Sequence, residues 1–308
     1  MQDELKEFNF IINEEGEGEG ERIDKYLNLL MESLSRSYLQ NLLKDGCVTV
    51  NNKVIKANYR LRCDDQIRLL VPPAITPDII PENIPLSVLY EDDDVIVIDK
   101  PKGMVVHPAA GHYKGTLVNA LLYHCSGNLS GINGILRPGI VHRIDMNTTG
   151  SVIACKNDLA HAKIAEQLKE HSIVRKYQAI VCGNLKDDEG TIHTLIGRHH
   201  TDRKKMAVVN TGGKDAITHY RVLKRFGNYT YVECRLETGR THQIRVHMSH
   251  IGHPLLGDEV YGHKEKHFDL QGQTLHAKIL GFRHPATGEY IETDAPLPEY
   301  FSKLLKTL

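Results

Sequence analysis

The sequence predicts a mixed α+β fold, built mainly on antiparallel strands, with a small α/β domain in front of it. The chain has 308 residues, which exceeds one average domain and favours a large body with a smaller appendage. Five prolines between residues 72 and 85 separate two such parts, because proline interrupts both helices and sheets. After them, short strand patterns alternate with helical ones, and neither GxGxxG nor GxxxxGK[ST] occurs.

We expect four segments: an acidic Glu/Gly lead-in 1–21, a small α/β domain 22–72, a proline-rich linker 73–85 and a large domain 86–308. The lead-in holds eight acidic residues against Lys6 alone, and its run "EEGEGEGE" has too little apolar surface to pack. Structure is therefore expected to begin at Arg22. The rest of the chain has 37 basic and 31 acidic residues, a net charge of +6, which is compatible with a polyanionic partner.

The small domain begins with two short helices. Ile23 and Leu27 recur at helical spacing, and a second helical pattern starts at Ser35 and stops at Gly46. Alternating valines, the turn "NNK" and a strand at 67–71 follow. Residues 36–68 carry seven Lys/Arg against three acids. Charge alone leaves open whether this is an ordinary solvated face or a surface that binds phosphates.

The large domain reads as strands with a few helices. A hairpin over an acidic turn is expected at 88–101 and a buried strand at 151–155. Residues 158–171 predict a helix capped by Asn157 or Asp158. Further elements follow in the order strand 175–183, strand 216–226, strand 229–239 and helix 241–253.

Composition excludes several classes of protein. Six cysteines are scattered without a CxxC pair, which favours reduced thiols over disulfides or a zinc site. His247, His250 and His253 recur every third residue without an acidic or cysteine ligand, so packing or RNA contact is preferred to metal binding. No run approaches the roughly 18 apolar residues of a membrane span, and the first residues lack the pattern of a signal peptide. We expect a cytoplasmic protein.

The segment 139–155, "GIVHRIDMNTTGSVIAC", places a histidine, an arginine and an aspartate in a polar loop between two apolar runs. Asp, Asn and Thr are ordinary turn residues, so the loop could be purely structural. A carboxylate beside fixed cations, however, stays ionised and can act as a nucleophile or base. Local sequence alone leaves both interpretations open.

Several ordered motifs together resemble one family. "GIVHRIDMNTTG" is similar to the catalytic-loop signature HR[LI]DxxT[ST]G of the RluA-type pseudouridine synthases. "DKPKGMVVHPAAGHYKGTLVNAL" precedes it, and "VRKYQAIVCG", "RHHTDRKKMAV" and "LETGRTHQIRVHMSHIGHPLLGDEVYG" follow. "SRSYLQNLLKDGCVTVNNKVIK" resembles the small RNA-binding domain named after ribosomal protein S4. The full pattern is most similar to the D-type synthases of large-subunit ribosomal RNA, which carry this domain in front.

The resemblance implies an isomerase that cleaves the N-glycosidic bond of a uridine in RNA and rejoins the uracil through a ring carbon, without a cofactor or metal. It implies that Asp145 is the nucleophile, Tyr177 stacks on the uracil and Arg245 pairs with the aspartate. On residues alone, Tyr177 would more often be a core residue and Ile244 would be core by its helical spacing. The implied substrate-binding residues are His142, Arg143, Thr148, Arg240, His242 and Ile244. In the small domain, the implied RNA-binding residues are Ser35, Arg36, Ser37, Lys44, Asn51 and Lys53.

Arg143 would fill the space vacated by the flipped uridine, although it could instead pair with a neighbouring acid or phosphate. The implied partner is large-subunit ribosomal RNA or a pre-ribosomal particle, with loop uridines at the subunit interface as targets and the enzyme acting as a monomer. A non-catalytic RNA-binding or ribosome-assembly factor is the alternative, but it would not need Asp145, Tyr177 and Arg245 together. A glycoside hydrolase would need two facing carboxylates, and only one candidate is convincing.

Overall fold

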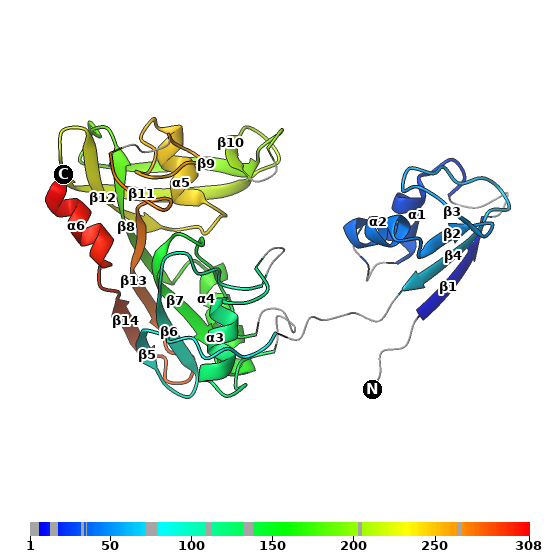
Figure 1. The fold of residues 1–308 in the computed structure, drawn as a ribbon, viewed down its shortest axis with the longest axis horizontal. Helices are drawn as coiled ribbons and strands as arrows, with labels where there is room; N and C mark the ends of the chain where they lie inside the picture. The colour runs from blue at the N-terminus through cyan, green and yellow to red at the C-terminus, as the bar shows by residue number, and fades with distance from the viewer. Residues whose placement is uncertain are drawn as a thin grey trace. The chain divides into compact units, whose positions relative to one another are not determined.

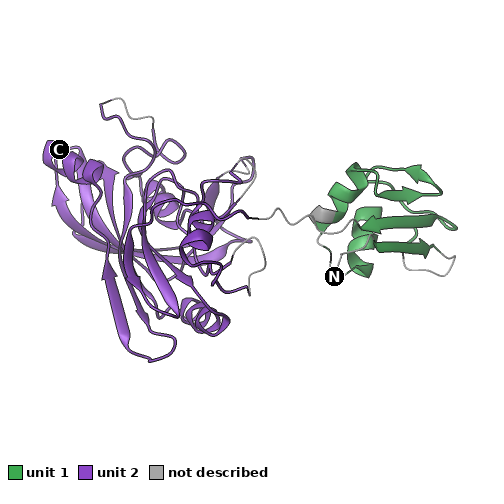
Figure 2. Ribbon diagram, turned by 60° about the horizontal axis from the view of Figure 1, so that its bottom comes forward, with its two compact units in different colours: residues 1–77 green, residues 78–308 purple. Residues whose placement is uncertain are grey.

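A computed structural model describes residues 6–12, 18–31, 34, 36–71, 79–108, 112–131, 138–202, 205–263 and 267–308. The chain divides into two compact units, Met1–Pro77 and Asp78–Leu308, each with its own hydrophobic core (Figure 2). Among the described residues, no helix combines the length and the apolar character that crossing a membrane requires. The α+β prediction with a small N-terminal domain is confirmed.

The first unit packs two helices on one small sheet whose strand order is β1-β4-β2-β3 (Figure 1). Ile23, Leu27, Leu39 and Leu43 are buried at the helical spacing that predicted these helices. The β2–β3 hairpin turns through Asn51 and Asn52, which both adopt the left-handed conformation that asparagine tolerates. The elements are β1 (Lys6–Ile11), α1 (Ile23–Leu30), α2 (Arg36–Lys44), β2 (Val48–Val50), β3 (Lys53–Val54) and β4 (Gln66–Val71).

The expectation that structure begins at Arg22 is wrong. Strand β1 pairs antiparallel with β4, in a register that runs from Lys6 opposite Val71 to Ile11 opposite Gln66. Phe8 and Phe10 alternate along this strand and pack against the core of the unit. The acidic composition of the segment hides this short alternation.

The predicted linker 73–85 also differs from the structure, because its second half belongs to the second unit. Ile79 packs against the core of that unit, and the backbone N–H of Glu82 donates to the carbonyl of Asn119 at 3.0 Å. The Asn119 side chain in turn donates to the carbonyl of Ile80 at 2.9 Å. Residues 73–78 of the predicted linker lie outside the described residues.

The second unit is organised around one ten-stranded sheet. Its strand order is β10-β9-β11-β12-β8-β13-β7-β6-β5, with β14 paired to β13. Every pair is antiparallel except β7 with β13. The strands are β5 (Val88–Glu91), β6 (Val95–Lys100), β7 (Thr149–Cys155), β8 (Val174–Cys182), β9 (Glu189–Arg198), β10 (Met206–Val209), β11 (Lys214–Arg225), β12 (Tyr229–Leu236), β13 (Leu275–Arg283) and β14 (Tyr290–Asp294).

Helices cover both faces of this sheet at β6 and β7, which explains why β7 is buried along its whole length. Residues of α3 share a core with Ile96 and Val152, whereas residues of α4 share a core with Val95 and Ile153 on the opposite face. Asn157 caps α4 by accepting from the N–H of Ala160. The helices are α3 (Leu117–His124), α4 (Asp158–Lys169), α5 (Gln243–His250) and α6 (Glu299–Thr307).

One glycine allows the close approach of β7 to β13. Gly150 has φ +105°, and a Cβ there would lie 2.3 Å from the carbonyl oxygen of Ala277. A side chain at this position would force the two parallel strands apart. The polar loop 139–149 therefore enters the sheet at a fixed point beside β13.

Candidate active site

Asp145 lies in the loop that precedes β7. The backbone N–H of Thr148 donates to the carbonyl of Asp145 at 3.0 Å and closes a tight turn. The buried hydroxyl of Thr148 accepts a hydrogen bond from Gln273 at 3.0 Å, and Ile144 is buried in the main core. The loop backbone is therefore held on both sides of Asp145, while its carboxylate keeps partial access to solvent.

A buried lysine donates hydrogen bonds to the backbone of the same loop and of the segment after β6. Lys100 is fully buried, and its ammonium donates to the carbonyls of Pro101, Met104 and Met146 at 2.8, 2.9 and 3.0 Å. Burial lowers the pKa of Lys100 to about 7, although the negative charge of Asp145 opposes this shift. Because Met146 directly follows Asp145, this amine fixes the position of the loop.

Arg245, on α5, connects Asp145 to a second carboxylate. Its Nη1 donates to Asp145 Oδ2 at 2.8 Å, while Nε and Nη2 donate to the two oxygens of Asp258 at 2.7 and 3.0 Å. Asp258 is 1 % exposed. Burial alone would lower the pKa of Arg245, but the hydrogen bonds to Asp258 and the charges of both carboxylates raise it above its ordinary value. A fixed cation thus orients Asp145.

His242 approaches the other carboxylate oxygen. Its Nε2 lies 3.6 Å from Asp145 Oδ1, and its Nδ1 lies 2.7 Å from the hydroxyl of Tyr261. That hydroxyl already accepts the N–H of Met206 at 2.8 Å, so its proton is available to Nδ1 and the imidazole proton belongs on Nε2. Burial lowers the pKa of His242, against the charge of Asp145. A neutral imidazole therefore directs an N–H toward Asp145.

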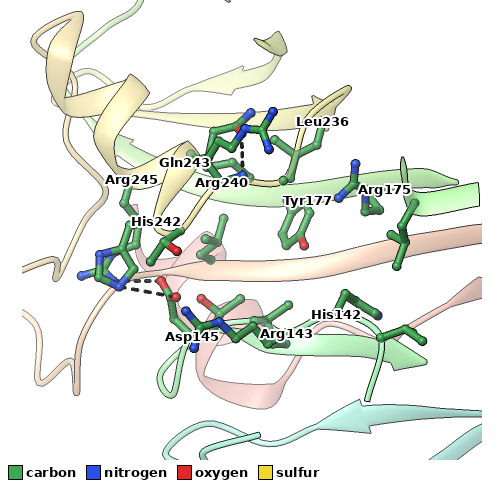
Figure 3. A pocket seen from close by; sticks show the side chains of 18 of the residues that line it. His142, Arg143, Asp145, Arg175, Tyr177, Leu236, Arg240, His242, Gln243 and Arg245 are labelled. Carbon is green, nitrogen blue, oxygen red and sulfur yellow. Dashed lines mark hydrogen bonds and ion pairs between the residues drawn. The ribbon is translucent and has the colours of Figure 1, made fainter. Parts of the chain in front are cut away.

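The carboxylate of Asp145 opens into a cavity of about 520 Å³, which is in the size range of small-ligand sites. Tyr177 of β8 and Ile244 of α5 form part of its wall. Figure 3 shows the Tyr177 ring between Asp145 and Arg175. Burial raises the pKa of Tyr177, so its hydroxyl is neutral at ordinary pH.

The structure brings every site residue predicted in the large domain to this one cavity. They are Asp145, Tyr177, Arg245, His142, Arg143, Thr148, Arg240, His242 and Ile244. Ile244 is both a core residue and a wall residue. His142 accepts the N–H of Ile153 on Nε2 at 3.0 Å, and burial lowers the pKa of His142 to about 4. This histidine is a neutral donor through Nδ1.

The residues predicted to bind RNA in the first unit have different surroundings. Lys44 and Lys53 are exposed, at the end of α2 and the start of β3. Arg36 is half-exposed, but its Nε and Nη2 both donate to the buried Asp24 at 3.0 and 2.8 Å. Burial opposes ionisation of Asp24, yet hydrogen bonds from Gln40, Arg22 and Arg36 lower its pKa to about 2. The arginine is therefore held in place.

Asn51 is engaged within the first unit. Its side chain donates to Asp65 at 2.9 Å and accepts from the N–H of Gln66 at 3.0 Å, which braces the β2–β3 turn. Ser35 and the side chain of Ser37 lie outside the described residues.

One group of side chains has the composition of a metal site. Ligand atoms of Asp92, Asp94 and His284 lie within 4.8 Å of one another. However, His284 Nδ1 accepts the N–H groups of Ala286 and Thr287, and Nε2 lies 2.7 Å from Asp92 Oδ2. Both ring nitrogens are thus engaged in hydrogen bonds, which accounts for the cluster as a structural network.

The histidines of α5 and the turn after it include two with partners inside the protein. His247 is fully buried between the hydroxyls of Thr194 and Thr218, at 3.0 and 2.9 Å. His253 lies 2.9 Å from the carbonyl of Cys182. Packing accounts for both residues.

Sequence reasoning assigned no role to four residues of the site: Lys100, Arg175, Asp258 and Tyr261. The motifs "DKPKG" and "GDEVYG" were noted in the sequence and contain Lys100, Asp258 and Tyr261. The contacts of these residues with the Asp145 loop, Arg245 and His242 depend on long-range packing, which the motifs do not reveal. Arg175 lies two residues before Tyr177, so the alternation of β8 places both on one face.

Comparisons with known proteins agree with this geometry. The family described as RNA pseudouridylate synthase matches residues 94–250, and the S4 domain matches residues 21–67. The RNA pseudouridine synthase YlyB of Bacillus subtilis (strain 168) is 52% identical over 292 residues, covering 95% of both chains. The ribosomal large subunit pseudouridine synthase D of Zymomonas mobilis is 47% identical over 299 residues, covering 94% of both. The solved structure of human RNA pseudouridylate synthase domain containing 1 matches with TM-score 0.57 and 27% identity, covering 70% of this chain and 85% of its own.

Proposed function

The chain belongs to the RNA pseudouridylate synthase family and is an isomerase that acts on RNA, and from this premise we propose that it converts loop uridines of large-subunit ribosomal RNA to pseudouridine, with Asp145 as the nucleophile. The observation that carries the proposal is the carboxylate of Asp145, held by Arg245 at 2.8 Å and open to the cavity that Tyr177 walls. A carboxylate fixed in this way needs no reorganisation before it reacts.

The reaction breaks the bond between the ribose C1′ and uracil N1 and forms one between C1′ and uracil C5. Asp145 assists departure of the base, and the proton lost from C5 is balanced by the proton gained at N1. Tyr177 supplies an aromatic face that retains the free uracil while it turns, since stacking on aromatic rings is sequence-tolerant and stabilising. We propose that its hydroxyl, which burial keeps neutral, exchanges a proton with the ring.

A uridine must leave its stack before it reaches Asp145. Arg143 is exposed and lines the cavity two residues before the aspartate, which supports the proposal that its side chain enters the vacated space. Loop uridines cost less to extrude than paired ones, which favours single-stranded loops as substrates.

The ribosomal target is supported by the similarity to the Zymomonas mobilis relative and by the S4 domain, whose Lys44 and Lys53 are exposed for phosphate contact. A ribosomal substrate would place the enzyme in the cytoplasm. Action as a monomer, on either free RNA or a pre-ribosomal particle, remains a prediction.

The target is tested by incubating the purified enzyme with unmodified large-subunit RNA, an isolated stem-loop and transfer RNA, followed by site mapping. We expect pseudouridine in loop uridines of the large-subunit RNA and none with Asp145→Asn. Modification confined to transfer RNA would refute the ribosomal target and leave the chemistry intact.

A further inference from the structure

A buried arginine that has no carboxylate partner among the described residues lies on the wall of the cavity. Arg175 is 7% exposed, and its Nη2 donates to the backbone carbonyl of Glu237 at 2.9 Å. Its Nε is buried and has no hydrogen-bond partner in the part of the chain that the structure describes. Its Nη1 has no hydrogen bond among the described residues and is not enclosed like Nε, so it is the donor that remains open to the cavity. A buried guanidinium without a counter-charge is costly.

The local backbone makes room for this guanidinium. A Cβ on Gly239 would lie 2.5 Å from Arg175 Nη1. Any other residue at 239 would therefore displace the group that faces the cavity. The glycine of "ETGR" thus serves the placement of an arginine that is 64 positions earlier in the sequence.

A second arginine adds positive charge to the same wall. Arg240 donates from Nε to the backbone carbonyl of Asp215 at 2.7 Å, and within the described chain no carboxylate forms an ion pair with it or with Arg175. Burial lowers the pKa of Arg175, Tyr177 opposes this shift, and the charge of Arg240 makes a smaller contribution that lowers the pKa further. Lys169 and His171 line the same cavity. Two unneutralised guanidinium groups repel each other until an anion lies between them.

We propose that Arg175 and Arg240 form a phosphate subsite that binds one backbone phosphodiester next to the target uridine. This inference rests on the proposed function and deepens it. An RNA substrate offers phosphates at every nucleotide, and the planar fork of arginine matches phosphate oxygens. A uracil carbonyl is neutral and would not offset the repulsion between the two cations.

The position of the subsite gives it a role in placing the base. Arg175 and Tyr177 lie on the same face of β8 (Figure 3), so a phosphate bound by Arg175 would be held beside the ring on which the uracil stacks. Phosphate contacts fix register without reading sequence. The phosphate subsite would therefore hold the flipped nucleotide over Tyr177 and Asp145. It would raise kcat/KM for any base sequence around the uridine.

The test replaces single phosphates near the target uridine by neutral methylphosphonates, in whichever RNA the wild-type enzyme modifies. With wild-type enzyme we expect kcat/KM to fall about 10- to 100-fold at one position, the effect of losing a charge-assisted hydrogen bond. In Arg175→Met that same substitution should cause no further loss. Arg283→Met is the matched control, because Arg283 also donates to a backbone carbonyl but does not line the cavity.

Gly239→Ala provides a second variant with unchanged charge, since the added Cβ displaces the guanidinium, and it should blunt the same methylphosphonate effect. The subsite would be overturned if, at every methylphosphonate position, the loss of kcat/KM caused by the methylphosphonate multiplied with the loss caused by each variant. It would also be overturned if no methylphosphonate changed kcat/KM of the wild-type enzyme. If Arg175→Met lowered kcat/KM by the same factor on all of these substrates, Arg175 would contact the base and not a phosphate, which would also overturn the subsite. Because the assay uses any modified RNA, failure of the ribosomal target would leave this test intact.

Discussion

Asp258→Asn tests whether Asp145 depends on the buried network behind it. The carboxylate accepts two hydrogen bonds from Arg245, at 2.7 and 3.0 Å, and its Oδ1 also accepts the N–H groups of Val260 and Tyr261 at 3.0 and 3.2 Å. Asparagine keeps one oxygen for those N–H groups but loses one charge-assisted bond to Arg245 and the negative charge. Such a bond contributes about 1.5–3 kcal/mol.

The loss should appear in turnover, because Arg245 reaches Asp145 through its third nitrogen. We expect kcat to fall about 10- to 100-fold, the equivalent of about 1.5–3 kcal/mol. The affinity for RNA should stay within a few-fold, since no phosphate contact is removed. Tritium release from uracil-labelled RNA under single turnover measures the first quantity, and filter binding measures the second.

Asp188→Asn is the matched control, because Asp188 pairs with Arg225 at the surface, where it is 84% exposed. Surface ion pairs contribute at most about 1 kcal/mol, so kcat should be unchanged. A folded Asp258→Asn enzyme with wild-type kcat would refute the claim that Asp258 positions Asp145 through Arg245.

Three further predictions concern stability, the loop and the first unit. Burial lowers the pKa of His247 to about 4 in the folded state, so the free energy of unfolding should fall by up to about 3 kcal/mol as pH falls from 6.5 toward 4. His247→Gln should reduce this dependence on pH in urea unfolding, and an unchanged dependence would contradict the prediction. Lys100→Met should leave RNA affinity intact but lower kcat, since the carbonyl of Met146 loses its hydrogen-bond donor. A kcat equal to that of the wild type would show that the loop of Asp145 keeps its conformation without Lys100. Deleting residues 1–77 should weaken RNA binding and reduce its salt dependence. Unchanged affinity and salt dependence would show that the first unit does not contribute to RNA binding.

Periodic apolar residues made much of the fold predictable. The helix predicted at 158–171 appears as Asp158–Lys169, and the hairpin predicted at 88–101 appears as β5 and β6. Strand β1 escapes prediction because its apolar residues alternate over only six positions inside an acidic segment. Its pairing with β4 depends on residues that lie 55 to 65 positions away in the sequence, which local sequence cannot reveal.

The site divides in the same way. Asp145, Tyr177 and Arg245 are predictable because their motifs resemble those of a known family, whereas on residues alone Tyr177 would more often be a core residue. The supporting residues are not, because a role such as that of Asp258 exists only when the fold brings it to Arg245. Arg175 is the extreme case, since an arginine on a strand looks solvent-exposed until its burial is known.

Asp145 is proposed to act in the chemical step of the reaction rather than in the binding of RNA. The most direct measurement compares wild type and Asp145→Asn for tritium release from uracil-labelled RNA and, with the same preparations, for RNA affinity. We expect turnover to be abolished while affinity stays within a few-fold, because the amide retains the shape of the side chain but is not a nucleophile. Tritium release by Asp145→Asn at the wild-type rate would contradict it.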